Sequence, residues 1–280
     1  MSRALVRAPR LAVVGVACLG CSGAGGSNSG AAGEPSGNDV DATSTDAPAV
    51  TDTGSREGGD GTLDWCGSQA TAHLFCEDFD QGVPGRLTSK TYGGGTVAAD
   101  VSDYVSAPES LWASTPPLVG PHGAGGAFAT ASFDATGPHF QLQADLQVAA
   151  DCAANSDGAT LAAVTFDTYS VTLLAALGGS YLVELTYGSD AGLAGSTQHR
   201  LAAPIPTNVW STIVIELDFS TREANVTVSG AAVLSHRPLS FVPSSTATAP
   251  TLGLGAEIQN QVGQSEGCRV RVDNVLFDSF

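Results

Sequence analysis

"HFQLQADLQV", residues 139–148, decides the fold class of this chain. Every second residue from Phe140 to Val148 is apolar, and the residues between them are polar. Successive side chains of a β-strand point to opposite faces, so an alternation of two places all the apolar residues on one face. The stretch therefore predicts a strand with one buried face and one face in water.

Similar runs recur along the chain and are rich in β-branched or aromatic residues. They are "ATLAAVTF" (159–166), "YSVTLLAA" (169–176), "SYLVELTY" (180–187), "TIVIELDF" (212–219), "EANVTVSG" (223–230) and "CRVRVDNVLF" (268–277). Gly, Pro, Asn or Asp bounds these runs, and no window of twelve or more residues prefers the helical period. Many short strands without intervening helices predict an all-β, antiparallel sandwich or barrel. We expect one such domain over residues 62–280.

The stretch "PIPTNVWSTIVIELDFSTREANVTVSGAAV" (204–233) resembles a recurrent hairpin of concanavalin A-like lectin and glucanase domains, including laminin G-like ones. "LFCEDFDQG" (74–82), "SAPESLWAST" (106–115) and "VRVDNVLFD" (270–278) resemble the early and closing strands of the same family. The resemblance implies a two-sheet β-sandwich of the jelly-roll type, with its first and last strands side by side. It specifies the fold and says little about function.

The N-terminal segment has the features of an export signal. Arg3, Arg7 and Arg10 precede an apolar stretch, Leu11 to Gly20, which would rise about 15 Å as a helix, half of the roughly 30 Å hydrocarbon core of a membrane. "CLGC" (18–21) resembles the bacterial lipobox, which implies that residues 1–21 are a lipoprotein signal peptide with Cys21 lipidated. A frame ending at Cys18 and plain secretion are the alternatives.

Residues 22–61 are rich in Gly, Ser and Asp and contain no aromatic residue. Such a segment cannot bury enough apolar surface to offset the entropy of ordering it. Its acidic residues outnumber its single base, Arg56, so self-repulsion extends the chain. We expect a disordered linker that holds the sandwich away from a membrane surface.

The charge balance excludes several classes of partner. The chain has 28 acidic and 11 basic residues and a net charge of −17, with Lys90 as its single lysine. This balance argues against binding to nucleic acid, and against contact with a membrane other than through the N-terminal lipid.

Four cysteines remain in the sandwich after Cys18 and Cys21 are set aside. An even number in an exported chain predicts two disulfides, for which three connectivities are possible. The short spacing between Cys66 and Cys76 favours that pair, leaving Cys152 with Cys268. Zinc is the rival interpretation, but no CxxC pair or suitably spaced His accompanies these cysteines.

The resemblance to concanavalin A-like glucanases directs attention to acidic residues, because these enzymes carry runs of three acidic residues on one strand that flank a glycosidic bond. The nearest equivalents here are Asp78 with Asp80 and Glu216 with Asp218, and each pair lacks the third acid. Asp218 can instead accept hydrogen bonds within the turn that follows it. The sequence predicts no complete catalytic cluster, although a polysaccharide hydrolase or lyase remains an alternative.

Binding of a glycan needs aromatic faces and planar polar groups. The candidate ligand-binding residues are Trp112, Tyr92, Tyr104, His139, Gln141 and Gln143. Oxygen donors in "DCAANSDGAT" (151–160) make Asp151, Asn155 and Asp157 weak candidates for calcium, and a simple turn explains the same pattern. No other cofactor or metal is expected.

These observations favour a lipid-anchored protein of the cell envelope, or else a secreted one, with a non-catalytic carbohydrate-binding or adhesion domain. A polysaccharide-degrading enzyme and a structural or protein-interaction module are the alternatives.

Overall fold

The structure is a computed structural model that describes residues 65–280 apart from 121–122, 136, 189–191, 242, 244–248 and 261–264. The expected signal peptide, with Cys18 and Cys21, and the expected linker lie outside the described residues. Within the described part, no helix is both long and apolar enough to cross a membrane.

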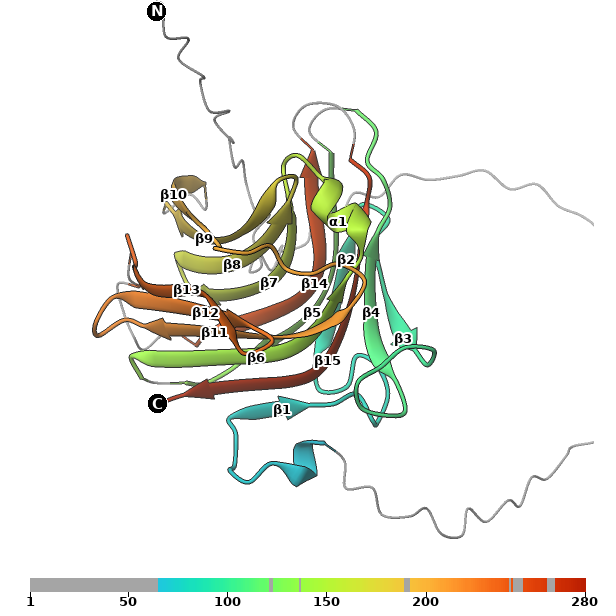
Figure 1. Cartoon of the computed structure of the whole chain (residues 1–280), viewed down its shortest axis with the longest axis horizontal. Helices are drawn as coiled ribbons and strands as arrows, with labels where there is room; N and C mark the ends of the chain where they lie inside the picture. Colours follow the sequence, from blue (N-terminus) through green and yellow to red (C-terminus); the bar gives the residue numbers. More distant parts are fainter. Residues whose placement is uncertain are drawn as a thin grey trace, which may run out of the picture. The chain divides into compact units, whose positions relative to one another are not determined.

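Two antiparallel sheets are stacked as the layers of a sandwich (Figure 1). Sheet A contains, in spatial order, β13 (Ala231–Pro238), β12 (Glu223–Val228), β11 (Trp210–Asp218), β6 (His139–Val148), β15 (Cys268–Ser279), β4 (Ser110–Thr115) and β3 (Thr96–Asp100), with β1 (Phe75–Glu77) also paired to β15. Sheet B contains β10 (Leu193–Arg200), β9 (Gly179–Tyr187), β8 (Tyr169–Ala176), β7 (Ala159–Phe166), β14 (Thr251–Asn260), β5 (Gly123–Ser132) and β2 (Thr88–Tyr92). The predicted all-β, antiparallel two-sheet sandwich is confirmed.

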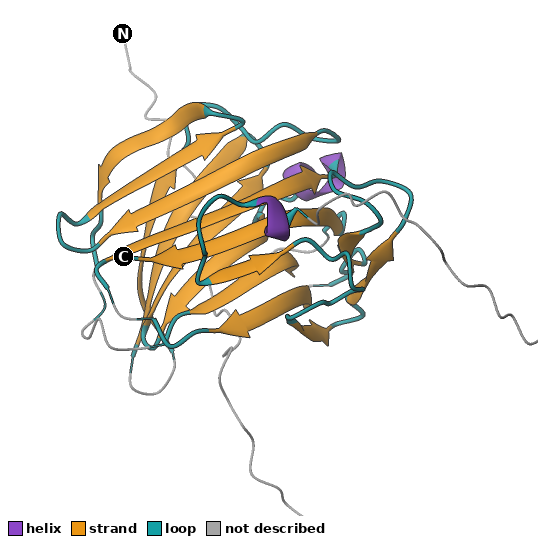
Figure 2. Ribbon diagram, turned by 90° about the horizontal axis from the view of Figure 1, so that it is seen from below, coloured by secondary structure: helices purple, strands orange, loops and turns teal. Residues whose placement is uncertain are grey.

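Helices are short, as the sequence predicted. The described part contains one α-helix, α1 (Ala150–Ala154), and one 3₁₀ helix, η1 (Cys66–Ser68). Figure 2 shows that strands make up most of the sandwich. Each predicted apolar run falls within or overlaps a strand, and residues 139–148 coincide with β6.

The core lies between the sheets and is built from the alternating apolar residues. Phe140 on β6 is 3% exposed, and its ring centroid lies 4.9 Å from that of Phe166 on β7 of the opposite sheet. Phe277 on β15 is fully buried beside it. Each fully buried side chain of this size contributes about 1.5–3 kcal/mol, so the alternation itself specifies the two-layer packing.

The first and last strands lie side by side, as the resemblance implied. β1 pairs with β15 so that Phe75 lies opposite Phe277 and Glu77 opposite Val275. The C-terminal strand is thereby paired with the strand that begins the described domain.

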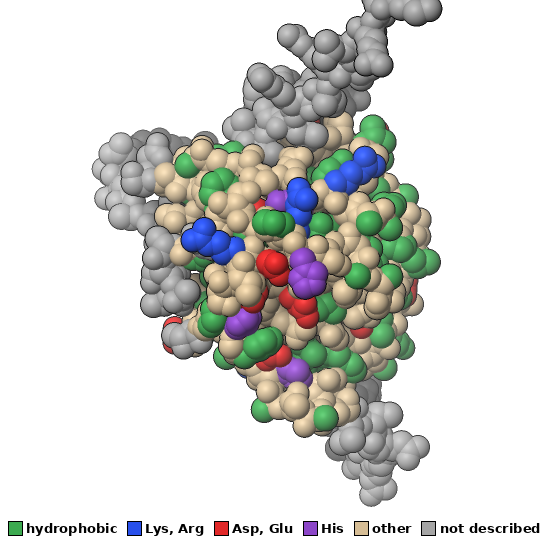
Figure 3. Space-filling view, turned by 60° about the vertical axis from the view of Figure 1, so that its left-hand side comes forward, with side chains coloured by type: hydrophobic (Ala, Val, Ile, Leu, Met, Phe, Trp, Pro, Cys, Tyr) green, Lys and Arg blue, Asp and Glu red, His purple; other side chains and the backbone are tan. Residues whose placement is uncertain are grey.

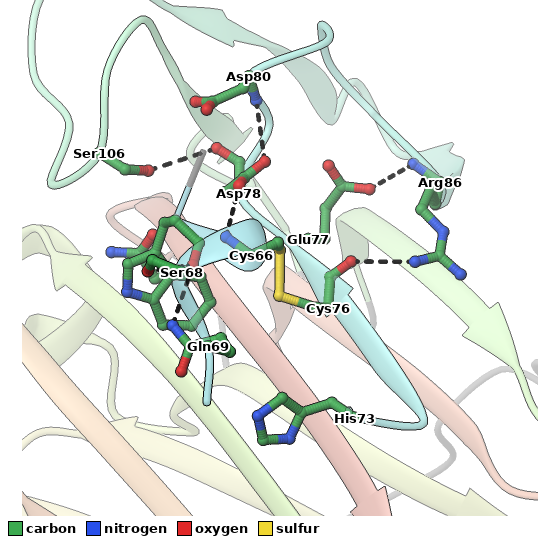
Figure 4. The surroundings of a disulfide bond; sticks show 12 residues. Cys66, Ser68, Gln69, His73, Cys76, Glu77, Asp78, Asp80, Arg86 and Ser106 are labelled. Atoms are coloured by element: carbon green, nitrogen blue, oxygen red, sulfur yellow. Dashed lines mark hydrogen bonds between the residues drawn. A yellow bond between two sulfur atoms is a disulfide. The ribbon is translucent and has the colours of Figure 1, made fainter. Parts of the chain in front are cut away.

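Two disulfides have the pairing that the sequence favoured, Cys66–Cys76 and Cys152–Cys268. Figure 4 shows how hydrogen bonds fix the first of them. The backbone N–H of Cys66 donates to Asp78 Oδ2 (2.9 Å), and the Arg86 guanidinium donates to the carbonyl oxygen of Cys76 (3.2 Å). The second disulfide joins α1 to the start of β15.

A buried polar cluster ties the two sheets together at one edge, and we call it the Glu184 clasp. Glu184 on β9 is fully buried and accepts hydrogen bonds from the Tyr169 hydroxyl (3.1 Å) and from backbone N–H groups at 240–241. His199 on β10 lies 2.6 Å from Glu184, and its Nδ1 accepts a hydrogen bond from Arg237 Nε on β13 (2.8 Å). The proton of His199 must therefore sit on Nε2, from which it is donated to Glu184.

We expect Glu184→Ala to destabilise the protein by about 3 kcal/mol or more, because His199, Tyr169 and two backbone N–H groups would lose their acceptor. Denaturant unfolding measures the change. The exposed Glu216→Gln variant is the control and should stay within about 0.5 kcal/mol of the wild type. Equal stabilities of the two variants would show that the clasp does not hold the edge.

The two disulfides should contribute unequally. They close loops with sequence separations of 116 and 10 residues, and a longer loop removes more entropy from the unfolded chain. We expect the Cys152→Ser/Cys268→Ser variant to lose about 2 kcal/mol more stability than Cys66→Ser/Cys76→Ser. Thermal unfolding of both variants tests this, and a larger loss from the short loop would contradict it.

Candidate functional site

Seven residues form a continuous line across the outer face of sheet B, and we call this line the transverse row. Strand register places them side by side on successive strands: Tyr92, Gly126, Glu257, Thr160, Leu174, Tyr181 and Arg200. Neighbouring strands are 4.7–4.9 Å apart, so six steps between strands span about 29 Å. The row combines two aromatic rings, a carboxylate, a hydroxyl and a guanidinium.

Tyr92 and Glu257 form the polar centre at one end of the row. The Tyr92 hydroxyl donates a hydrogen bond to Glu257 Oε1, and Gln259 Nε2 donates to the same oxygen at 3.3 Å. The Tyr92 ring lies against Gly126, where a Cβ atom would overlap it, so the glycine on β5 is what allows the ring to lie close to the sheet.

Burial controls the protonation of this pair. Glu257 is 5% exposed, and burial raises its pKa, although hydrogen bonds from Tyr92 and Gln259 and the charge of Lys90 oppose the rise. Burial, followed by the Glu257 carboxylate, raises the pKa of Tyr92 well above its ordinary value. The phenol therefore keeps its proton and serves as a donor, while Glu257 serves as the acceptor.

Tyr181 and Arg200 lie at the other end of the row. The Tyr181 side chain is partly exposed, and Arg200 is exposed on β10, the edge strand of sheet B. One terminal nitrogen of Arg200 donates to the carbonyl oxygen of Gly178 (2.6 Å), which fixes the guanidinium beside the turn that precedes β9. This end can contact a ligand with an aromatic face and a fixed cation.

The structure separates the ligand-binding residues that the sequence suggested. Tyr92 belongs to the transverse row, but Trp112, His139, Gln141 and Gln143 lie on strands of sheet A. Tyr104 is 41% exposed in the loop between β3 and β4. The polar alternation of β6 thus marks the outer face of sheet A, and it is not brought together with Tyr92.

The outer face of sheet A is dominated by paired charges. His139 stacks on Phe280, and Gln141 Nε2 donates to Glu216 (3.3 Å). Figure 3 shows histidine and acidic side chains gathered on one face of the molecule. The pairs recorded at the end of sheet A are His73–Asp278 (2.6 Å), His139–Asp218 (3.5 Å) and His236–Glu223 (2.9 Å).

In each of the two carboxylate pairs considered for catalysis, one member accepts hydrogen bonds from the backbone. Asp78 accepts the hydrogen bond from the Cys66 N–H. Asp218 accepts from the N–H groups of Ser220 (2.8 Å) and Thr221 (3.0 Å), the turn role that the sequence suggested. Burial opposes its ionisation, but these hydrogen bonds outweigh burial and hold the pKa of Asp218 well below its usual range.

The calcium candidates lie at α1 and in the turn that follows it. Asp151 Oδ2 accepts a hydrogen bond from Arg269 Nε (2.8 Å), and Asn155 Nδ2 donates to the carbonyl oxygen of Gly267 (2.7 Å). Asp157 is partly exposed two residues further on. Among the residues that the structure describes, no group of three or more His, Cys, Asp or Glu side chains is arranged to hold a metal ion.

Glu257, Tyr181 and Arg200 were not recognised as site residues from the sequence. Tyr181 has a local signal, because it alternates with the buried Ser180 and Leu182 in β9. Glu257 lies in "TLGLGAEIQN" (251–260), where glycines weaken the alternation. Their proximity depends on the register of strands far apart in the sequence, and no local pattern reports that register.

Comparison with known proteins adds two structures of similar architecture. An endo-β-1,4-glucuronan lyase from the fungus Trichoderma reesei superposes with a TM-score of 0.57 and 11% identity, covering 75% of this chain and 96% of the lyase. The cellulose-induced protein Cip1 gives a TM-score of 0.51 and 15% identity, covering 74% of this chain and 97% of Cip1. The likeness is one of fold. No protein-family model and no curated protein sequence matches this chain.

Removing the Tyr92 hydroxyl should change the titration of Glu257. The hydrogen bond from Tyr92 stabilises the ionised carboxylate, so Tyr92→Phe should raise the pKa of Glu257 further. Carbon-detected NMR of the labelled carboxyl group measures the change. Tyr104→Phe is the matched control and should leave the Glu257 titration where it is; an unchanged titration in Tyr92→Phe would contradict the geometry.

The raised pKa of Glu257 in the folded wild-type protein also predicts that the free energy of unfolding depends on pH. Because the folded-state pKa of Glu257 is raised, its protonated form favours folding at low pH, and this contribution is lost as the pH rises through the folded-state value. Glu257→Gln cannot ionise, so its stability relative to wild type should increase with pH over that window. Denaturant unfolding at several pH values tests the sign, and the opposite trend would refute it.

Proposed function

We propose that the protein binds an extended glycan along the transverse row. The observation that carries this proposal is the alignment of Tyr92, Glu257, Thr160, Tyr181 and Arg200, five of the seven residues of the row, across the seven strands of sheet B. Aromatic rings can contact the apolar face of a sugar ring, and the polar side chains can bond its hydroxyl groups. A line of such groups suits a chain of sugars better than a compact ligand.

The structural neighbours support a carbohydrate-related role. The glucuronan lyase is named for its action on a polysaccharide, and this chain has the same fold over nearly the whole lyase. Because identity is 11%, the activity of the lyase is not carried over to this chain. The proposal depends on the residues of the row.

Binding is favoured over catalysis by the composition of the row. Glycoside hydrolysis commonly uses two carboxyl groups that flank the scissile bond, and Glu257 is the one carboxylate in the row. Elimination would need a base, but burial holds the proton on Tyr92. A lyase or hydrolase is therefore the second candidate, and the experiment below separates it from binding.

We also propose that the chain is exported and anchored to the cell envelope through a lipid on Cys21. Two disulfides support an oxidising compartment. Mass spectrometry of the membrane fraction tests the anchor: a lipid mass on Cys21 supports it, and a mature chain cleaved elsewhere contradicts it.

A glycan panel tests the proposed binding. The purified mature protein should bind linear oligosaccharides, and Tyr181→Ala should weaken binding by about two- to tenfold, because a sugar–aromatic contact is lost. Tyr104→Ala removes an exposed tyrosine outside the row and should bind like wild type.

Cleavage should be assayed in the same samples. Binding without new reducing ends or unsaturated products supports a non-catalytic function, whereas product release identifies an enzyme. Failure to bind any glycan, or a loss in Tyr104→Ala instead of Tyr181→Ala, would refute binding by the row and favour a structural module.

A further inference from the structure

A hollow lies on the outer face of sheet A, the sheet opposite the transverse row, and we call it the Trp112 hollow. Trp112, Gln147, Ala149, Asn208, Arg269 and Arg271 line it on the outer face of sheet A, and its volume is about 110 Å³. Two of the chain's 11 basic residues meet here, in a protein with a net charge of −17. The glycan-binding proposal makes no use of this site.

Arg271 is fixed in position above the indole ring. Its guanidinium carbon lies 4.6 Å from the Trp112 ring centroid. Its Nε donates to Asp100 (2.6 Å), and one terminal nitrogen donates to Gln147 Oε1 and lies 3.6 Å from Asp103. The stack and the two aspartates hold the guanidinium plane before any ligand arrives.

Hydrogen bonds also keep the two aspartates ionised. Burial opposes ionisation of Asp100, but hydrogen bonds from Ser102 and Arg271 outweigh it and lower its pKa. A hydrogen bond from Trp210 Nε1 (2.8 Å) is the main cause that lowers the pKa of Asp103. Asp100 and Asp103 therefore stay negatively charged over the physiological pH range and keep the Arg271 guanidinium in position.

Arg269 lies two residues before Arg271 on the same face of β15. Its side chain is 54% exposed, and its Nε is paired with Asp151 at 2.8 Å. Within the described part of the chain, no acceptor is recorded for its terminal nitrogens or for the second terminal nitrogen of Arg271. These donors are left for a ligand in the hollow.

The other polar groups around the hollow supply few free acceptors for these hydrogen-bond donors. Gln147 is engaged at both ends, because its Nε2 donates to Asp103 (2.9 Å) and its Oε1 accepts from Arg271. Asn208 is exposed and carries an amide with two donors and one acceptor. The vacant hydrogen-bonding capacity therefore suits a ligand group that only accepts.

The size of the hollow limits the group that fits. Its volume of about 110 Å³ leaves room for one small planar or tetrahedral anion. A complete sugar ring would extend out of it. We propose that the Trp112 hollow binds a single oxyanion group, the carboxylate of a uronate or a sulfate ester, with Arg269 and Arg271 as its donors.

Titration of the full mature chain tests this site. The indole N–H signal of Trp112 is followed by NMR as sodium sulfate, sodium glucuronate or neutral glucose is added, with sodium chloride holding ionic strength constant. Sulfate or glucuronate should shift the signal saturably, and glucose should not. The more effective anion identifies the source of the oxyanion group.

Two arginine variants complete the test. Arg269→Gln should weaken anion binding about tenfold or more, because a charge-assisted donor is lost. Arg222→Gln removes an exposed arginine outside the hollow and should behave like wild type. Shifts that grow without saturation, or that survive Arg269→Gln, would overturn the proposal. Binding of neutral oligosaccharides by the row should be unchanged in Arg269→Gln, so the two proposals can fail separately.

Discussion

The pairing of β15 is the constraint on which the rest of the sandwich depends. The last strand of the chain lies between β6 and β4 and also pairs with β1, so it joins the beginning, the middle and the end of the domain in one sheet. Its inward side chains Val270, Val272, Val275 and Phe277 are fully buried. In sheet A, this strand is what connects β4, β3 and β1 to β6 and the strands beyond it.

The Glu184 clasp and the transverse row are linked through β10. His199 points between the sheets and is held by Glu184 and Arg237. Arg200, the next residue, must then point to the outer face, because neighbouring side chains of a strand alternate. The position of a proposed ligand-binding residue is thus set by a buried contact on the other side of the same strand, and the edge of the sheet gains a fixed geometry that an unpaired edge strand lacks.

Much of the fold could be predicted from the sequence, because most strands carry their own alternation. The predicted bounds of β6 were correct and most of β11 was predicted, whereas β5 and β14 were not, since Gly126, Gly253 and Gly255 have no side chain to report a face. Small residues are needed there, as the Tyr92 ring over Gly126 shows. The site was harder to predict for a related reason: the sequence marked Tyr92, but its partner Glu257 becomes visible only when the register of β2, β5 and β14 is known.

The Cys152–Cys268 disulfide has a consequence for the integrity of the molecule. The two cysteines enclose the segment from β7 to β14, with five of the seven strands of sheet B and exposed turns such as those at Gly178 and Gly230. A protease that nicks one of these turns produces two polypeptides that are still covalently joined, with every strand still paired to its neighbours. Proteases would therefore have to cut this segment more than once before a fragment of the sandwich could dissociate.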